Sequence, residues 1–171
     1  KELKTPKSTI PVKEVEAFSV DDQKKLVKEL MEDKITQKIP ILLSIYTLMR
    51  SGEILALRKA DIDLKNKVIK VRRTMTRGTD GRRKIGNKTK TYTSSRDITI
   101  SPDVEILINM ALDEYVENPE QLLFCNKDGK PYTTQALNSC FKRFCEKHNI
   151  DKGYNVNFHQ LRHTGITRLI E

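Results

Sequence analysis

The chain has 171 residues and a formal net charge of +9, from 32 lysines and arginines against 23 aspartates and glutamates. This length is enough for one domain with its own core, and the excess of positive charge favours a polyanion, above all nucleic acid, as partner. The sequence shows no apolar run that could span a membrane and no signal-peptide pattern at its start. We therefore expect a cytoplasmic protein without a membrane partner.

The three cysteines, Cys125, Cys140 and Cys145, form no C-x-x-C pair, and their odd number argues against a disulfide framework. They also lack the spacing of zinc ligands, either to one another or to His148. We expect a reducing environment, no metal site and no cofactor.

Residues 1–16 contain two prolines among several lysines, a composition typical of an extended linker, and we interpret them as a linker from an upstream DNA-binding domain. A first helix is predicted from near Ser19, a good N-cap, to about Glu32. A second, strongly apolar helix is predicted from Ile39 towards Arg50.

The tetrapeptide Arg50-Ser51-Gly52-Glu53 breaks the second helix and starts a third, which we expect to reach Arg58. Ser51 can cap this helix, and Gly52 relieves the steric limits at the junction. Glu53 can brace the Arg50 guanidinium so that its remaining N–H groups face outward. The alternative is an ordinary ion pair at a helix junction.

Extended segments are predicted at 68–76 and 89–100, with a turn at 78–81 and a basic stretch between them, which indicates two or three antiparallel strands. From position 72 to 90 one acid, Asp80, accompanies a dense set of cations. They are Arg72, Arg73, Arg77, Arg82, Arg83, Lys84, Lys88 and Lys90. This density favours contact with a phosphate backbone, and a hairpin that is merely soluble is the alternative.

Two further helices are predicted, one starting at Ser101-Pro102 and one from Gln135 to His148. A last helix follows from Phe158. The expected fold class is thus α+β, mainly α, in which helices surround a small antiparallel sheet of two to three strands.

The last helix places His159, Arg162 and His163 on one face. This face suits chemistry at a phosphodiester, because a guanidinium can bind two non-bridging oxygens while an imidazole moves a proton near neutral pH. One alternative is a solvated polar face with one buried histidine. Another is a zinc site formed by the two histidines, but Gln160 replaces the Glu of H-E-x-x-H and Arg162 adds a fixed cation.

Three separated motifs follow one another in the chain: Arg50 with Gly52-Glu53, then Thr89-Lys90-Thr91, then His159-x-x-Arg162-His163-Thr164. In this order and spacing they resemble the catalytic domain of the tyrosine recombinases, the phage and transposon integrase family. The resemblance covers residues 17–171. It implies site-specific recombination of double-stranded DNA through a 3′-phosphotyrosyl intermediate, with self-association on DNA in the full-length protein.

The resemblance also implies a role for each matching residue. Arg50 and Arg162 would clamp the scissile phosphate, Lys90 would protonate the departing 5′-oxygen, and His159 would exchange a proton with the nucleophile. Glu53 would support the first arginine. Lys88 competes with Lys90, which we prefer for its Thr-Lys-Thr setting with Arg96 six residues on, and His163 is expected to be a supporting residue.

General chemistry agrees with these roles, since donors aimed at the non-bridging oxygens stabilise a pentavalent arrangement more than the ground state, and no metal is then needed. The five tyrosines all precede His159, so none matches the family's nucleophile. We therefore expect a domain that is incomplete at its C-terminus and that binds DNA phosphate without cutting it. The alternative is a non-catalytic basic DNA-binding module, which would leave Arg50 and Glu53 at their glycine-marked junction unexplained.

Overall fold

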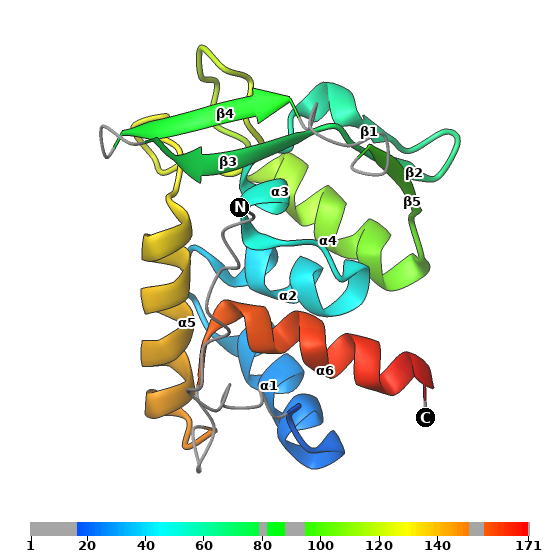
Figure 1. The fold of residues 1–171 in the computed structure, drawn as a ribbon, viewed down its shortest axis with the longest axis vertical. Coiled ribbons are helices and arrows are strands. Elements are labelled where there is room, and N and C mark those ends of the chain that lie inside the picture. Colours follow the sequence, from blue (N-terminus) through cyan, green and yellow to red (C-terminus); the bar gives the residue numbers. More distant parts are fainter. Residues whose placement is uncertain (1–16, 79–81, 88–94, 151–155, 171) are drawn as a thin grey trace, which may run out of the picture.

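The computed structural model describes residues 17–78, 82–87, 95–150 and 156–170, and these form six α-helices, one 3₁₀ turn and five strands (Figure 1). The helical elements are α1 (Val20–Glu32), α2 (Lys38–Thr47), α3 (Ser51–Leu55), η1 (Lys59–Asp61), α4 (Pro102–Asp113), α5 (Thr134–Lys147) and α6 (Phe158–Ile170). The strands are β1 (Ile62–Asp63), β2 (Val68–Val71), β3 (Arg73–Arg77), β4 (Arg83–Asn87) and β5 (Arg96–Thr99). This composition confirms the predicted α+β, mainly α, fold class.

Helix α2 is the centre of the core. It is apolar around most of its circumference, as expected for a helix that is largely covered, and the run from Ile39 to Ile45 is buried while Tyr46 remains exposed. Helices α1, α3, α4 and α6 all contact it. In Figure 1 the strands lie above α2 and helix α1 below it. The chain segment that leaves α2 is therefore anchored in the buried core of the molecule.

The strands form two separate antiparallel sheets, one in the order β1-β2-β5 and the other made of β3 and β4. The single strand predicted over 68–76 is wrong, because β2 pairs with β5 whereas β3 pairs with β4. The chain changes partner at Arg72, whose guanidinium turns back onto β5. It donates to the carbonyl oxygen of Arg96 at 3.0 Å and pairs with Asp97 at 2.5 Å.

Strand β4 occupies the stretch that the sequence indicated only as basic. Its residues have low strand propensity, but pairing with β3 decides the conformation, and Ile85 lies opposite the buried Met75.

Three phenylalanine rings fix the start of α6. Phe141 of α5 is buried and meets Phe18 and Phe158 edge-on, with ring centroids 6.4 Å apart in each pair. The backbone N–H of Phe18 also donates to the hydroxyl of Thr164 at 3.0 Å. Since Phe158 directly precedes His159, this packing sets where the polar face of α6 begins.

Two glycines let elements approach at backbone distance. A Cβ atom at Gly165 would overlap the side chain of Leu48, so α6 packs directly on the end of α2. A Cβ atom at Gly52 would overlap the carbonyl oxygen of Met75 and lie 2.8 Å from the hydroxyl of Thr74, so α3 packs directly on β3. Both close contacts lie beside the segment that carries Arg50.

A polar cluster ties α1 to the end of α5. The carboxylate of Asp33 is 10% exposed and lies 2.7 Å from the ammonium group of Lys147 and 3.1 Å from Nε2 of His148. The other ring nitrogen of His148 lies 2.9 Å from the carboxylate of Glu29. The hydrogen bonds from Lys147 and then His148 lower the pKa of Asp33 to about 2.

Replacing Asp33 by Asn should lower the free energy of unfolding at pH 7 by about 1–2 kcal/mol. The folded-state pKa of about 2 lies below the ordinary value of 3.8, so this stabilisation is present above pH 3.8 and is lost as the pH falls towards 2. Urea unfolding at pH 7 and at about pH 2.5 measures it. The gap between wild type and Asp33→Asn should shrink at the lower pH, and a gap of unchanged size would contradict the proposed linkage. Asp113→Asn, which removes an exposed carboxylate of α4, is the control.

Candidate active site

The junction between α2 and α3 has an unusual backbone. Leu48 ends α2 with φ 54°, in the left-handed region that costs energy for a residue with a side chain. Arg50 is extended and takes the N-cap position of α3, where the Glu53 carboxylate accepts its backbone N–H at 3.0 Å. The prediction that Ser51 caps this helix is wrong, since Ser51 lies in its first turn and the glutamate three residues beyond Arg50 reaches back instead.

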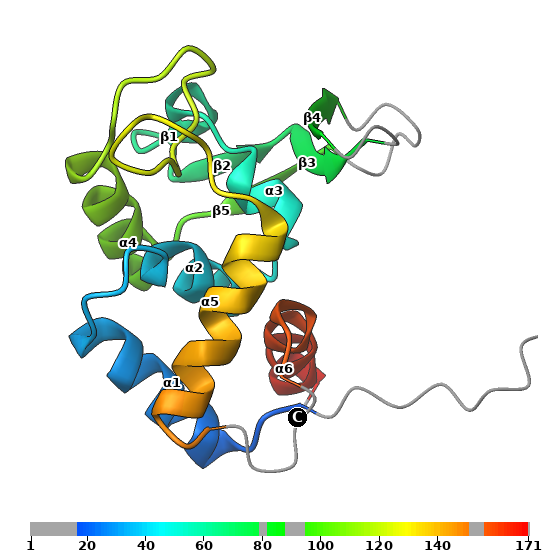
Figure 2. The same ribbon diagram turned by 90° about the vertical axis from the view of Figure 1, so that its left-hand side faces the viewer.

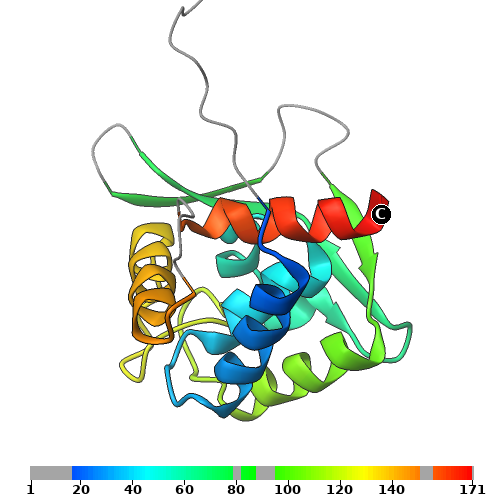
Figure 3. The same cartoon turned by 90° about the horizontal axis from the view of Figure 1, so that it is seen from below.

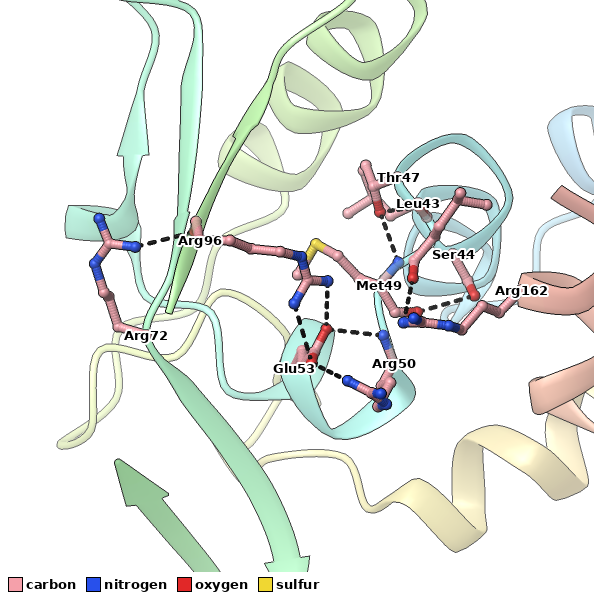
Figure 4. Close-up of polar contacts among 10 residues, drawn as sticks. Leu43, Ser44, Thr47, Met49, Arg50, Glu53, Arg72, Arg96 and Arg162 are labelled. Atoms are coloured by element: carbon pink, nitrogen blue, oxygen red, sulfur yellow. Dashed lines mark hydrogen bonds and ion pairs between the residues drawn. The ribbon is translucent and has the colours of Figure 1, made fainter. Parts of the chain in front are cut away.

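The Glu53 carboxylate is fully buried and binds two arginines (Figure 4). Arg50 donates one guanidinium N–H to it at 3.2 Å, and Arg96 donates two, at 3.3 and 2.8 Å. The side chain of Arg50 nevertheless remains 60% exposed. Glu53 therefore holds Arg50 in place while most of its guanidinium stays accessible to a ligand.

Helix α6 supplies the second arginine. Nη1 of Arg162 donates to the backbone carbonyl of Leu48 at 2.8 Å, and in the part of the chain that the structure describes we find no other acceptor for this guanidinium. His159 and His163 lie edge-on, with ring centroids 4.6 Å apart. The left-handed turn at Leu48 thus aims a carbonyl group at Arg162 and fixes it beside the junction that carries Arg50.

Arg50, His159 and Arg162 line one hollow of about 160 Å³, which Met49, Ser51 and Phe158 complete. The structure thus brings together three of the four predicted catalytic residues, although Arg50 lies more than 100 positions before His159 and Arg162 in the sequence. A larger cavity of about 470 Å³ lies against the start of α2, and it contains none of them.

The charges at this hollow affect its own titrating groups. Partial burial lowers the pKa of His159, and the nearby charges of His163, Arg162 and Arg50 lower it further. Burial also lowers the pKa of Arg162, with a contribution from the charge of Arg50, although a guanidinium stays protonated under all ordinary conditions. The hollow is therefore a cationic site that favours a neutral imidazole and an anionic ligand.

Several predicted DNA-binding cations have carboxylate partners within the chain. Arg72 pairs with Asp97, as described, and Arg83 pairs with Glu120 through both nitrogens at 2.7 and 2.9 Å. Arg73 pairs with Asp61, and its side chain is only 18% exposed. Arg73 and Arg83 thus join the β3–β4 sheet to η1 and to the segment after α4, and Arg72 joins the start of β3 to β5.

Three other cations of this stretch, Arg77, Arg82 and Lys84, are exposed on the β3–β4 hairpin. Lys88 and Lys90 lie outside the described residues. The hairpin and α6 lie on the same side of the molecule, at the right of Figure 2 and along the upper edge of Figure 3. The hairpin that carries these exposed cations therefore lies on the same side of the molecule as α6, the helix that supplies His159 and Arg162 to the hollow.

Sequence reasoning missed two parts of this site. Arg96 alternates with Asp97 so that it shares the inward face of β5 with Ile98, and a cation at an inward strand position was a readable signal for a buried acid. The carbonyl of Leu48 had no signal, because a left-handed leucine cannot be recognised from residue type.

Among the described ranges, no group of three or more His, Cys, Asp or Glu side chains has the arrangement of a metal site. The described helices also include none with the length and apolarity needed to cross a membrane.

Comparison with known proteins identifies the family. The model of the phage integrase family matches residues 16–171. The integrase of Staphylococcus phage L54a is 34% identical over 135 residues, which cover 72% of this chain and 37% of that relative.

Solved structures share the fold. The Tn1549 transposon integrase, in complex with a circular intermediate DNA, has a TM-score of 0.82 at 21% identity over 94% of this chain and 54% of its own. The XerA recombinase has a TM-score of 0.69 at 21% identity over 99% of this chain and 56% of its own. The chain thus spans about half the length of these two structures and 37% of the phage L54a integrase. Because the family model matches nearly the whole of this chain, the chain belongs to the phage integrase family.

Proposed function

We propose that this chain is the catalytic core of a site-specific DNA recombinase, which cuts and rejoins strands by phosphodiester transesterification. Membership of the phage integrase family supports the class of reaction. The observation that carries the proposal is the hollow in which Arg50, His159 and Arg162 meet. Two guanidinium groups beside an imidazole match the charge and hydrogen bonding that a phosphodiester requires.

In the proposed reaction, the two guanidinium groups bind the non-bridging oxygens of the scissile phosphate. A tyrosine oxygen attacks the phosphorus, the bond from phosphorus to the 5′-oxygen breaks, and a 3′-phosphotyrosyl intermediate remains. The pentavalent arrangement carries extra negative charge, so both arginines stabilise it more than the ground state. Rejoining is the reverse, in which a 5′-hydroxyl attacks and the tyrosine leaves.

Two residues are proposed to move protons in this reaction. His159 would take the proton from the attacking tyrosine, a role that suits an imidazole whose lowered pKa keeps it neutral near pH 7. Lys90 would give a proton to the departing 5′-oxygen. Glu53 and His163 are proposed to support the clamp.

We place the nucleophilic tyrosine outside these 171 residues. Tyr46, Tyr115 and Tyr132 are not part of the hollow, since Tyr46 lies beside α1, Tyr115 lies under Lys59, and Tyr132 lines the larger cavity. Two further tyrosines, at positions 92 and 154, lie outside the described residues. Residues 17–171 would then be a catalytic domain that binds DNA without cutting it, preceded by a linker at 1–16.

Double-stranded DNA is the proposed partner, lying across the side that α6 and the β3–β4 hairpin share (Figure 3). The exposed cations of the hairpin would contact the phosphate backbone, and self-association on DNA is part of the proposal for the whole protein. Contacts of these cations to phosphate would contribute affinity more than sequence preference.

The chain should bind duplex DNA with an affinity that falls steeply as salt rises, because phosphate contacts release counterions. Fluorescence anisotropy at three salt concentrations gives the slope of log affinity against log salt. Replacing Arg77, Arg82 and Lys84 together by Ala should reduce this slope by about 2–3. Lys142→Ala, which removes a cation of α5, is the control and should leave it within about 0.5.

Affinity that does not change with salt would contradict the proposal. A protein that extends this chain through its tyrosine and still forms no covalent adduct on a nicked duplex would favour the alternative, a non-catalytic DNA-binding module.

A further inference from the structure

The buried carboxylate at the candidate active site binds an arginine that the proposed catalytic set does not include. We propose that Arg96 is a positioning residue, which occupies the Glu53 carboxylate so that Arg50 keeps most of its N–H groups for phosphate. The inference rests on the proposed function, because it concerns how the phosphate clamp is assembled.

The hydrogen bonds to Glu53 are divided unequally. Oε1 accepts from Nη1 of Arg50 at 3.2 Å and from Nη1 of Arg96 at 3.3 Å. Oε2 accepts from the backbone N–H of Arg50 at 3.0 Å and from Nη2 of Arg96 at 2.8 Å. These four donors, all from residues that the structure describes, share one carboxylate, which offers about four lone-pair directions. Arg96 forms a bidentate pair with Glu53, whereas the Arg50 guanidinium forms a single hydrogen bond with it. We call the bidentate pair the Arg96 fork.

This unequal sharing of the Glu53 carboxylate matters because a bidentate pair is the preferred geometry between a guanidinium and a carboxylate. Glu53 is buried, so losing the Arg96 fork would leave its charge poorly compensated. Arg50 is exposed and has a long side chain, so it could rotate to form the fork itself. Two of its N–H groups would then point at Glu53 and away from the hollow.

Arg96 is held by the sheet rather than by a ligand. It starts β5 and lies opposite Val71 of β2, with its side chain on the inward face, and its carbonyl oxygen accepts from Arg72 (Figure 4). The fork on Glu53 is therefore in place before any anion arrives, which is the condition for a preorganised site.

Titration of the chain with inorganic phosphate, followed through the side-chain Nε–Hε NMR signals of its arginines, tests this role. Wild type should show shifts at Arg50 and Arg162 on binding. Arg96→Lys keeps the charge but loses the fork, so we expect phosphate affinity to fall about tenfold, equivalent to one charge-assisted hydrogen bond. Its Arg50 signal should also move before phosphate is added, since Arg50 turns towards Glu53.

Lys70→Met is the control for removing a cation from the same sheet. Lys70 lies on β2, next to the strand of Arg96, and pairs with Asp63, so this control removes one sheet cation without touching Glu53. Lys70→Met should change phosphate affinity by less than about twofold. Thermal unfolding checks that each variant is folded. If Arg96→Lys is unfolded, Arg96→Gln replaces it, because the glutamine side chain still has an amide N–H donor group.

Two outcomes separate the hypotheses. If Arg96→Lys binds phosphate like wild type with an unmoved Arg50 signal, Arg96 has no positioning role and the proposed function stands. If wild type itself shows no response at Arg50 and Arg162, the phosphate clamp fails, and both proposals fall with it.

Discussion

Under the proposed function, replacing Arg162 by Ala should slow DNA strand cleavage by about 10³-fold or more, in a protein that joins this chain to the proposed downstream tyrosine. Arg162 is fixed by the Leu48 carbonyl at the edge of the hollow, where its remaining N–H groups could bind a phosphate oxygen. Removing it takes away a donor that acts mainly on the charge that develops in the transition state. The single-turnover rate of covalent adduct formation on a nicked duplex measures this effect.

Binding and cleavage should respond differently to this change. DNA affinity of Arg162→Ala should fall by no more than about tenfold, because one phosphate contact among several is lost. Thr167→Ala is the matched control on the same helix, since it removes the hydroxyl that bonds to the carbonyl of His163. It should cleave within about threefold of wild type, and an Arg162→Ala rate within about tenfold of wild type would contradict the clamp.

Replacing Gly52 by Ala should lower the free energy of unfolding by about 1–3 kcal/mol, the usual cost of overpacking. The new methyl group would overlap the backbone carbonyl of Met75 and crowd the hydroxyl of Thr74, and a backbone atom of a paired strand cannot move aside as a side chain can. Urea unfolding measures the loss. Helix α3 would have to move away from β3, so phosphate affinity at Arg50 should fall as well.

Gly86 provides the control for this prediction. It lies on β4, and a Cβ atom built there would meet nothing within 4 Å. Gly86→Ala should therefore change the free energy of unfolding by less than about 0.5 kcal/mol. Equal stability of Gly52→Ala and wild type would show that α3 is not held against β3 as described.

Local signals in the sequence were sufficient for most helices. Ser19, Ser101 and Thr133 all cap helices through their hydroxyl groups, and the apolar stripe of each helix meets the core. Such caps act within a few residues, so a single sequence contains the whole interaction. The fold class followed from these elements and their order.

The parts that could not be predicted depend on contacts between distant positions. The change of sheet at Arg72 depends on β5, and the bond from Arg96 to Glu53 joins residues 43 positions apart. Neither the sequence around Arg50 nor the sequence around Arg162 indicates the other arginine. Their proximity was therefore expected only from the family resemblance. Local propensity cannot show which distant partner a strand or a guanidinium will find.

The contact between Leu48 and Gly165 constrains how this site can change over evolutionary time. Leu48 adopts a backbone conformation that glycine would adopt at lower cost, and its side chain fills the space that the missing Cβ of Gly165 leaves open. A lineage that first gained a side chain at 165 would push α6 away from the carbonyl that holds Arg162. A lineage that first shortened residue 48 would keep that carbonyl and remove the overlap, which leaves the carbonyl oxygen of Ile45, 3.2 Å away, as the nearest neighbour of the new Cβ atom. Substitution at 165 should therefore cost less stability after residue 48 has been shortened, and we expect the two positions to vary together among relatives.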